Sequence, residues 1–441
     1  MICASGLPNF QINSLQFGKF NCEDLDYNEV QEQKFTRAGN WQIIDSKDRI
    51  SPLIGLHSAI VSSRSTFFLP KDKDMKWAKK MIDILETTNA NHEGLAAFVT
   101  SGSSGEPTVV IHRTTSLIEA CNKILSQFPE LRNNVFQHLF PSTYMAGILN
   151  NTLLPWIANS KIFLDNEFSF QSPFSIGEAS QLQQTRFAWL SPSMMSSLTS
   201  AAGAKNFIKP QWEFYLSATA PLFTEVRDRF HDAFGIHGFN TYGSTELLFI
   251  SAEHEWDSTV TSGNPLMGVK VEMTSTGEMP DTLSQEIFVE TNTSPVGIIK
   301  WQDETHEYQY VDLESIKRFS TRDIGHWEGE RIMLTGRTDD IIVLGGINFS
   351  LANCEKIAKS FPGVVEACAF APYGGSFLDL TLVYEIALGS SDFSEPNYLE
   401  FLKRELGAKY FPRNLVLKKL PRTHTGKVDR QAIRKIVIAS K

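Results

Sequence analysis

A run of small hydroxyl and glycine residues, TSGSSGEP, directly follows the apolar stretch LAAFV. Two glycines permit positive φ and let backbone N–H groups approach a ligand, and successive N–H groups form a concavity that binds anions. The spacing is not that of a Walker loop, which ends in Gly-Lys-Ser or Gly-Lys-Thr. Alone, the run indicates either a phosphate-binding loop or a plain surface turn. The residues concerned are Thr100, Ser101, Gly102, Ser103, Ser104 and Gly105.

Four later stretches carry groups suited to a nucleotide. In NTYGSTE, the Glu246 carboxylate is a ligand that Mg²⁺ prefers, and Tyr242 offers a flat face to a purine. STRDIGHW contains Asp323, which could accept both hydroxyls of a ribose, and GRTDD places Arg337 beside two aspartates. LPRTHTGKVDR presents Lys427 after a glycine. Each stretch alone has an ordinary explanation, such as a turn or a solvated ion pair. The combination of all five indicates a nucleotide site.

Size and composition limit the class of protein. A chain of 441 residues exceeds one usual core, so two or more domains are expected. The net charge of −9 and the scattered basic residues argue against nucleic acid as a partner. Five cysteines without a CxxC pair indicate reduced thiols. No targeting pattern and no apolar run of about 20 residues is found. We therefore expect a soluble cytoplasmic protein without a membrane span.

Short apolar runs alternate with helical patterns from about residue 51, as in α/β proteins. In TTSLIEACNKILSQF, Ser116 and Glu119 have the spacing of a capping box, which predicts a helix start at Ser116. TEVRDRFHDAFG predicts a second helix, with Phe230 on its apolar stripe and Gly235 placed to end it. The apolar face of the first helix would consist of Leu117, Ala120, Cys121 and Ile124.

The last part of the chain has a different pattern of predicted strands and helices. After about residue 337, strand-like runs and helical patterns mix within roughly 100 residues, as expected for a small α+β domain. The predicted segments are a strand and turn at IIVLGGINF, a helix at NCEKIAKSF, strands at VVEACAFAP, LDLTLVYEI and NLVLKKL, and helices near 398–406 and from Asp429. We place the domain boundary at GRTDD, residues 336–340.

Taken together, TSGSSGEP, YGSTE, the Asp323 stretch, GRTDD and PRTHTGK resemble the adenylate-forming enzymes. That superfamily includes acyl- and aryl-CoA synthetases, firefly luciferase and nonribosomal peptide adenylation domains. The resemblance covers roughly residues 50 to 441. It implies an α/β fold with a large N-terminal AMP-binding domain of mixed β-sheets packed with helices, residues 1–336, shortened at its start. A small mobile α+β domain, 337–441, would carry a catalytic lysine and rotate about a hinge near 336–340.

The resemblance also implies roles for single residues. The 100–105 loop would wrap the β- and γ-phosphates of ATP, Thr245 would touch the α-phosphate, and Glu246 would hold Mg²⁺. Lys427 would bind the α-phosphate and the substrate carboxylate. Ala218, Ala220 and Pro221 would line the adenine and acyl pocket, and Tyr242 would stack on the adenine. The remaining assignments are Gly243 among the ATP- and AMP-binding residues, Asp323 and Arg337 on the ribose, Asp339 at the hinge, and Tyr144 and Gly147 in the acyl pocket.

The expected reaction is activation of a carboxylic acid by ATP and Mg²⁺ to an acyl-adenylate, followed by transfer to a thiol of coenzyme A or of a carrier-protein phosphopantetheine. FPSTYMAGILNN lacks the carboxylate that would pair with an amino acid, so an aryl or fatty acid is expected. The chain departs from the family pattern at Glu106, Thr108 and Arg322. Thr108 and the expected shortening of the N-terminal domain motivate an alternative, a relic that binds nucleotide or acyl ligand as a sensor or partner module.

Overall fold

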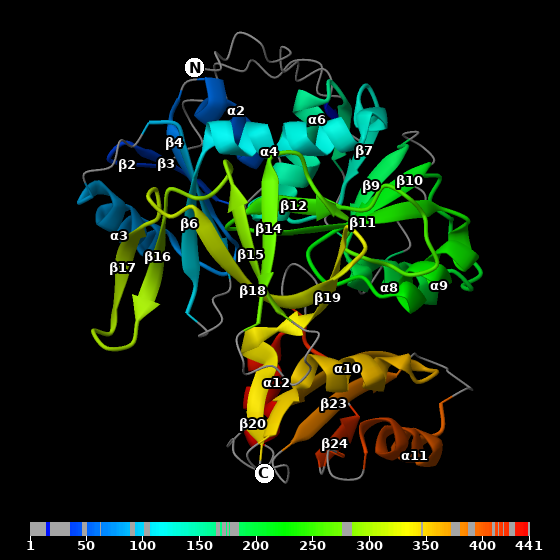
Figure 1. Cartoon of the computed structure of the whole chain (residues 1–441). Coiled ribbons are helices and arrows are strands. Elements are labelled where there is room, and N and C mark those ends of the chain that lie inside the picture. The colour runs from blue at the N-terminus through cyan, green and yellow to red at the C-terminus, as the bar shows by residue number, and fades with distance from the viewer. Residues whose placement is uncertain are drawn as a thin grey trace. The chain divides into compact units, whose positions relative to one another are not determined.

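The structure, a computed structural model, describes residues 15–17, 36–45, 51–61, 63–88, 93–100, 106–164, 168–169, 173, 176, 185–275, 285–344, 347–371, 380–386, 393–407, 411–412, 414–417, 419–422 and 428–439. The chain forms two compact units (Figure 1). The first comprises Met1–Leu222, Arg227–Lys270 and Val289–Phe319, and the second comprises Phe223–Val226, Val271–Phe288 and Ser320–Lys441. The units are interleaved in sequence, and the boundary at 336–340 stays a prediction.

The first unit is built on two large sheets. The eight-stranded sheet has the order β1-β8-β7-β9-β10-β11-β12-β13, and its strands from β1 to β11 are parallel to their neighbours. Its strands are β1 Leu15–Phe17, β7 Val135–His138, β8 Lys161–Leu164, β9 Phe187–Leu190, β10 Phe214–Ser217, β11 His237–Ser244, β12 Leu248–Ala252 and β13 Asn264–Pro265. Parallel strands of this kind are buried on both faces, which explains the all-buried pattern of β9.

The second sheet of this unit has seven strands in the order β17-β16-β6-β5-β4-β3-β2. They are β2 Thr36–Ala38, β3 Trp41–Asp45, β4 Ser65–Leu69, β5 Leu95–Thr100, β6 Thr108–Arg113, β16 Gly297–Gln302 and β17 Glu307–Asp312. The run LAAFV therefore forms a buried strand, β5, as its apolar composition predicts. β5 and β6 are antiparallel neighbours, and Thr100 pairs with Thr108 across the ends of the TSGSSGEP run.

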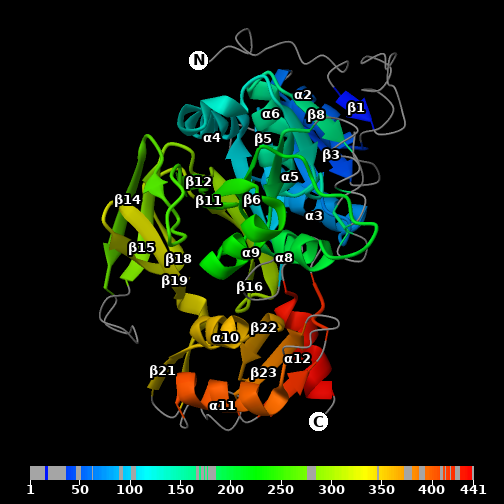
Figure 2. The same cartoon turned by 90° about the vertical axis from the view of Figure 1, so that its right-hand side faces the viewer.

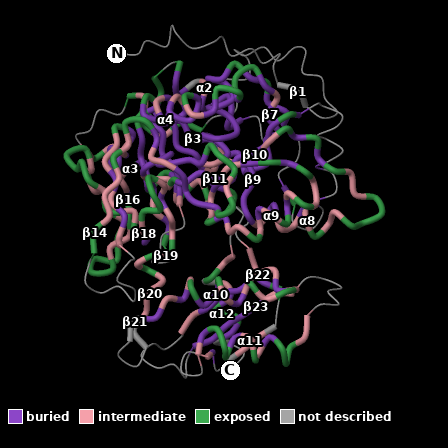
Figure 3. The backbone as a smooth tube through the Cα atoms, turned by 45° about the vertical axis from the view of Figure 1, so that its right-hand side comes forward, coloured by how far each residue is buried: buried purple, intermediate pink, exposed green. Residues whose placement is uncertain are grey.

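Helices separate and cover these sheets. α4 (Thr114–Gln127) contacts both β6 and β12, so it is sandwiched between the two sheets, with α6 (Leu154–Ile157) beside it (Figures 1 and 2). α3 (Met75–Glu86) packs on the other face of the seven-stranded sheet. Figure 3 shows the buried residues concentrated in the strands of both sheets. The other helices are α2 Ser51–Val61, α5 Met145–Ile148, α8 Pro192–Ala201 and α9 Thr224–Phe234, with a π-helical turn at Leu149–Leu153 and a 3₁₀ turn at Pro129–Leu131.

The second unit contains a small α+β core. The strands are β22 Val364–Phe370, β23 Thr381–Ile386 and β24 Asn414–Leu417, and the helices are α10 Leu351–Ser360, α11 Glu395–Leu406 and α12 Arg430–Ala439. Side chains alternate along β23, so Leu382 and Tyr384 pack with α10 and α11, whereas Val383 packs with α12. Figure 2 shows these helices with the sheet. The unit also holds the hairpin β20 Ile341–Leu344 and β21 Ile347–Ser350, a 3₁₀ turn Thr338–Asp340, and most of the sheet β14 Val269–Thr274, β15 Gln285–Thr291, β18 Arg318–Glu328 and β19 Arg331–Arg337.

Both predicted helices of the first part exist, with one correction. The apolar face Leu117, Ala120, Cys121 and Ile124 is fully buried, which confirms it. The capping box is wrong: α4 begins at Thr114 with Arg113 in the cap position and no capping side chain, so Ser116 lies inside the first turn.

α9 ends where the sequence predicts. Gly235 follows its last residue with a φ of 72°, a left-handed conformation that glycine adopts without strain. None of the helices within the described ranges is long and apolar enough to cross a membrane.

Candidate nucleotide-binding site

The predicted site residues of the first unit follow neighbouring parallel strands. Ser217 of β10 pairs with Leu190 of β9 on one side and with Asn240 of β11 on the other. The carboxyl ends of these strands therefore meet at one edge of the sheet, the place where open α/β sheets bind ligands. Ala218, Ala220 and Pro221 follow β10, the Tyr242–Glu246 stretch spans the end of β11 and the two residues after it, and Tyr144 and Gly147 follow β7. Parallel pairing thus brings segments from Tyr144 to Glu246, 102 positions apart in the sequence, to the same edge.

The segment after β10 is strained at Thr219. This residue has a φ of 77°, a left-handed conformation that costs a β-branched residue about 1–3 kcal/mol. The Ala218 N–H donates to the Leu190 carbonyl at 3.0 Å, which fixes the segment against the end of β9. The hydroxyls of Ser217 and Thr219 are buried and have no partner among the described residues. Such strain at the edge of the sheet is typical of functional sites, and the sequence analysis did not identify Thr219.

The YGSTE turn has a backbone shape that its glycine permits. The β11–β12 pairing shifts register between Tyr242 and Gly243, and a Cβ on Gly243 would lie 2.1 Å from the Leu248 carbonyl oxygen. Leu248 itself has a φ of 58°, and the Ser244 hydroxyl accepts from the Leu247 N–H at 3.1 Å. Tyr242 is buried, whereas Glu246 is half-buried. The turn thus carries a partly exposed carboxylate four residues after a buried tyrosine.

A histidine from the other sheet holds this turn. His112, on β6, is fully buried, and its Nε2 lies 2.7 Å from the Thr245 carbonyl oxygen. Because a carbonyl only accepts, Nε2 carries the proton and donates. Burial lowers the pKa of His112 to about 4, so the ring is neutral at physiological pH. The contact spans 133 residues of sequence, and no local pattern in the chain indicates it.

The phosphate loop is described only at its two ends. Ser101, Gly102, Ser103, Ser104 and Gly105 lie outside the described residues, as does Lys427. Thr100 ends β5, and the Glu106 carboxylate accepts a hydrogen bond of 2.9 Å from the Tyr308 hydroxyl. Burial, reinforced by Glu106, raises the pKa of Tyr308 to about 12. The tyrosine thus holds the Glu106 carboxylate at the end of the TSGSSGEP run.

The two predicted acyl-pocket residues lie in the segment after β7. The Tyr144 hydroxyl donates to the Asp72 carboxylate at 3.3 Å, so a carboxylate from a distant segment lies near this tyrosine. A Cβ on Gly147 would lie 1.9 Å from the Pro141 carbonyl oxygen. The close packing of α5 is therefore a sufficient reason for glycine at this position. The π-helical turn that follows is fully buried, and π-bulges occur frequently at functional sites. The acyl-pocket assignment stays a prediction.

The predicted ribose residues lie in the second unit. Asp323 and Arg337 face each other across β18 and β19, and an Arg337 nitrogen lies 3.3 Å from an Asp323 oxygen. Arg322 has a φ of 60°, which explains why this position usually holds glycine in the family. Arg322 also forms an ion pair of 2.9 Å with Asp339, the predicted hinge residue. These four side chains form one charged cluster.

Both ends of the Lys427 segment are anchored within the same unit. Arg422 and Val428 form an antiparallel bridge, and the Asp429 N–H donates to the Pro421 carbonyl at 2.8 Å. Arg430 donates two hydrogen bonds of 2.7 Å to the Glu355 carboxylate, so this arginine at the start of α12 is paired within the unit.

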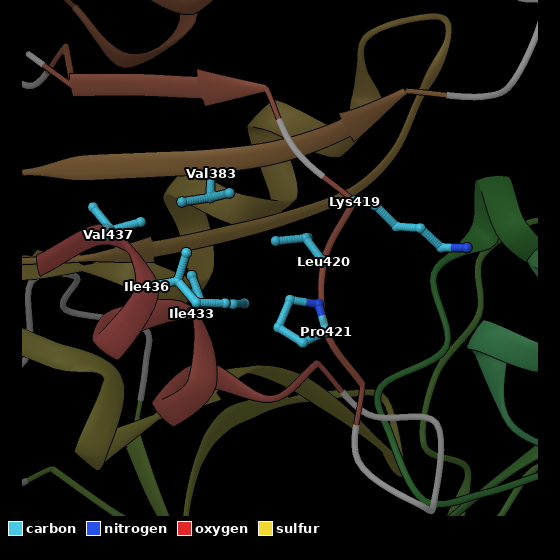
Figure 4. A pocket seen from close by; sticks show the side chains of 7 residues that line it. All are labelled: Val383, Lys419, Leu420, Pro421, Ile433, Ile436 and Val437. Carbon is cyan, nitrogen blue, oxygen red and sulfur yellow. The ribbon is translucent and has the colours of Figure 1, made fainter. Parts of the chain in front are cut away.

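A small apolar recess lies beside this segment (Figure 4). It lies between α12 and the segment around Leu420 that follows β24, and Lys419 at its rim points away from it. Its lining residues are Val383, Lys419, Leu420, Pro421, Ile433, Ile436 and Val437.

The residues present fit Mg²⁺ that arrives with a nucleotide. Within the described ranges, no group of three or more His, Cys, Asp and Glu side chains could hold a resident metal ion. Mg²⁺ is commonly bound by one or two carboxylates together with substrate phosphates, and Glu246 offers one half-buried carboxylate.

Comparison with known proteins agrees with this geometry. Residues 47–291, more than half of the chain, match the family described as AMP-binding enzyme. The mitochondrial malonate–CoA ligase of Mus musculus is 23% identical over 388 residues, which are 80% of this chain and 66% of that protein. A 2-succinylbenzoate–CoA ligase of Bacillus mycoides is 26% identical over 212 residues, 46% of this chain and 42% of that protein. The chain thus spans less than two thirds of the length of these relatives.

Solved structures show the same fold. ATP-bound MatB from Rhodopseudomonas palustris superposes with a TM-score of 0.70 at 16% identity, covering 93% of this chain and 91% of that one. The anthranilate CoA ligase AuaEII, in complex with anthranoyl-AMP, superposes with a TM-score of 0.66 at 16% identity, covering 91% and 79%. The predicted α/β fold class is therefore confirmed.

Proposed function

The chain belongs to the AMP-binding enzyme family, and from this premise we propose that it activates a carboxylic acid with ATP and transfers the acyl group to a thiol. The observation that carries the proposal is the convergence of Ala218, Tyr242 and Glu246 at one carboxyl edge of parallel strands. Ligands of open α/β sheets bind at such an edge. The curated relatives named above are acid–CoA ligases, which supports the same reaction class.

In the proposed mechanism, the residues of this chain orient the reactants and offset charge. Tyr242 stacks on the adenine, the Thr245 hydroxyl donates to the α-phosphate, and Asp323 with Arg337 holds the ribose. The carboxylate and the α-phosphate repel each other, so attack requires cations and in-line positioning. The Lys427 ammonium supplies one positive charge, and Mg²⁺ held through Glu246 neutralises charge on the phosphates when bound. The attacking carboxylate displaces pyrophosphate and leaves a mixed anhydride, from which water must be excluded.

In the second step, the sulfur of a thiol attacks the acyl carbonyl carbon and AMP leaves. We propose an aryl or fatty acid as the substrate, because the described segment after β7 carries no carboxylate of its own. Asp72, however, lies beside the Tyr144 hydroxyl, so amino acids belong in the test. The thiol is that of coenzyme A or of a carrier-protein phosphopantetheine.

Acid-dependent exchange of labelled pyrophosphate into ATP tests the proposal. The acids are aryl acids, fatty acids of medium length, malonate, 2-succinylbenzoate and amino acids, the third and fourth chosen from the names of the relatives. We expect exchange with at least one acid, and a loss of at least about tenfold in Glu246→Gln. The exposed carboxylate Glu130 provides the control, since Glu130→Gln removes an equal charge from a surface turn.

Two results would contradict the proposal. Nucleotide binding without exchange for any acid would support the non-catalytic sensor instead. Exchange at the wild-type rate in Glu246→Gln would exclude the role given to that carboxylate. Where exchange is found, thioester formation with coenzyme A and with a phosphopantetheinylated carrier protein then distinguishes the two acceptors.

A further inference from the structure

We infer that His112 is a positioning residue for the turn that carries Thr245 and Glu246, and the functional part of this inference rests on the proposed function. His112 contacts neither nucleotide nor acid in this proposal. It acts through the backbone of Thr245, whose carbonyl oxygen lies 2.7 Å from its Nε2.

The donor and the acceptor of the hydrogen bond between His112 and Thr245 can both be assigned. His112 lies on β6 between β5 and β16, with none of its surface exposed, so no water competes for the hydrogen bond. The Thr245 carbonyl can only accept, which assigns the proton to Nε2. The other ring nitrogen, Nδ1, has no partner in the part of the chain that the structure describes. The ring therefore makes one directed contact, and that contact is with the turn.

The turn needs an external contact because its own backbone is irregular. The ladder between β11 and β12 shifts register at Gly243, and Leu248 occupies a left-handed conformation. Inside the turn, the Leu247 N–H donates a hydrogen bond to the Ser244 hydroxyl. That bond does not reach the peptide between Thr245 and Glu246. The His112 bond holds this peptide by its oxygen, and the orientation of the peptide sets the direction in which the Glu246 side chain leaves the backbone.

His112 also connects two sequence motifs through one strand. β6 starts at Thr108, shortly after the TSGSSGEP run, and its antiparallel partner β5 leads into that run. The same strand reaches across to the YGSTE turn through the His112 ring. A displacement of β6 would therefore move the end of the phosphate run and the carboxylate turn together, which is useful if both bind one nucleotide.

The test compares two substitutions at His112 and one elsewhere. His112→Leu keeps the site apolar and leaves the Thr245 carbonyl without its donor, whereas His112→Gln retains an amide donor at a similar reach. Gln42→Leu is the control, because Gln42 is an equally buried polar side chain of the same unit, bonded to the Gly55 carbonyl and the Thr66 hydroxyl. All variants are made in the full chain.

Two measurements are made, and neither requires turnover. Amide hydrogen exchange of the peptide covering 242–249 is followed without nucleotide, and ATP binding is titrated against Mg²⁺ by calorimetry. In His112→Leu we expect the turn amides to exchange about tenfold faster and the half-saturating Mg²⁺ concentration to rise about tenfold, as when an outer-shell partner is lost. His112→Gln should restore both values to within about threefold, and Gln42→Leu should change neither.

Unchanged turn exchange in His112→Leu, or an equal change in Gln42→Leu, would overturn the inference. Faster exchange in His112→Leu with an unchanged Mg²⁺ requirement would overturn its functional part. If the wild-type protein binds ATP but activates no acid, the proposed function fails, yet the exchange and binding measurements still decide whether His112 positions the turn.

Discussion

Acidification should weaken the folded state through His112 by an amount that can be worked out. Burial lowers the pKa of His112 from 6.5 to about 4 in the folded protein. Between these values the unfolded chain binds a proton that the folded chain does not, so the free energy of unfolding falls as the pH falls. From pH 6.5 to pH 5 the loss is about 2 kcal/mol, since each pH unit corresponds to about 1.4 kcal/mol. Below about pH 4 the folded and unfolded states both bind the proton, so the loss of unfolding free energy through His112 does not increase further.

The comparison that isolates this contribution is wild type against His112→Gln. The glutamine does not titrate, so the stability difference between the two proteins should shrink by about 2 kcal/mol from pH 7 to pH 5. Other titrating groups, including the partly buried His57, are present in both proteins and cancel. Urea denaturation at both pH values, followed by tryptophan fluorescence, measures the difference. A difference that stays constant with pH would show that the His112 ring is not held neutral by burial, which would refute the reasoning.

Two further substitutions test packing and charge. Gly147→Ala should destabilise the protein by at least about 2 kcal/mol in urea denaturation, because the new Cβ would lie 1.9 Å from the Pro141 carbonyl oxygen. Gly203→Ala is the control and should have little effect, because the space around Gly203 is open. Equal effects of the two substitutions would contradict the packing argument. Glu355→Gln should lower the melting temperature of the second unit and its free energy of unfolding by about 2 kcal/mol, because it leaves the Arg430 guanidinium without its carboxylate. An unchanged melting temperature would show that the pair contributes no net stability.

Several features of the candidate site were predictable from local pattern. YGSTE is recognisable because a glycine, hydroxyls and a carboxylate occur within a few residues, and its glycine is indeed required by the close approach of Leu248. The apolar face of α4 follows from helical spacing, which is a local property of the chain. The helix start was less predictable, because α4 begins at Thr114, two residues before the expected cap, and no side chain caps it.

Other features depend on segments that are distant in the sequence. Nothing near His112 indicates a bond to Thr245, and Asp72 lies 72 residues from Tyr144. The left-handed backbone of Thr219 is likewise imposed by its surroundings, since the residue type disfavours it. Such contacts arise from how sheets and helices pack, and residue spacing carries no information about them.

The amino-acid sequence by itself determined the family, the order of the motifs and the residue types available for phosphate, ribose and metal. Those follow from short-range chemistry, because each motif carries its functional groups within a few residues. Only the tertiary structure decided that the segments after β7, β10 and β11 share one edge, and that a buried imidazole holds the carboxylate turn. Parallel pairing brings strand ends together regardless of their separation along the chain, and this long-range geometry is what the sequence leaves undetermined.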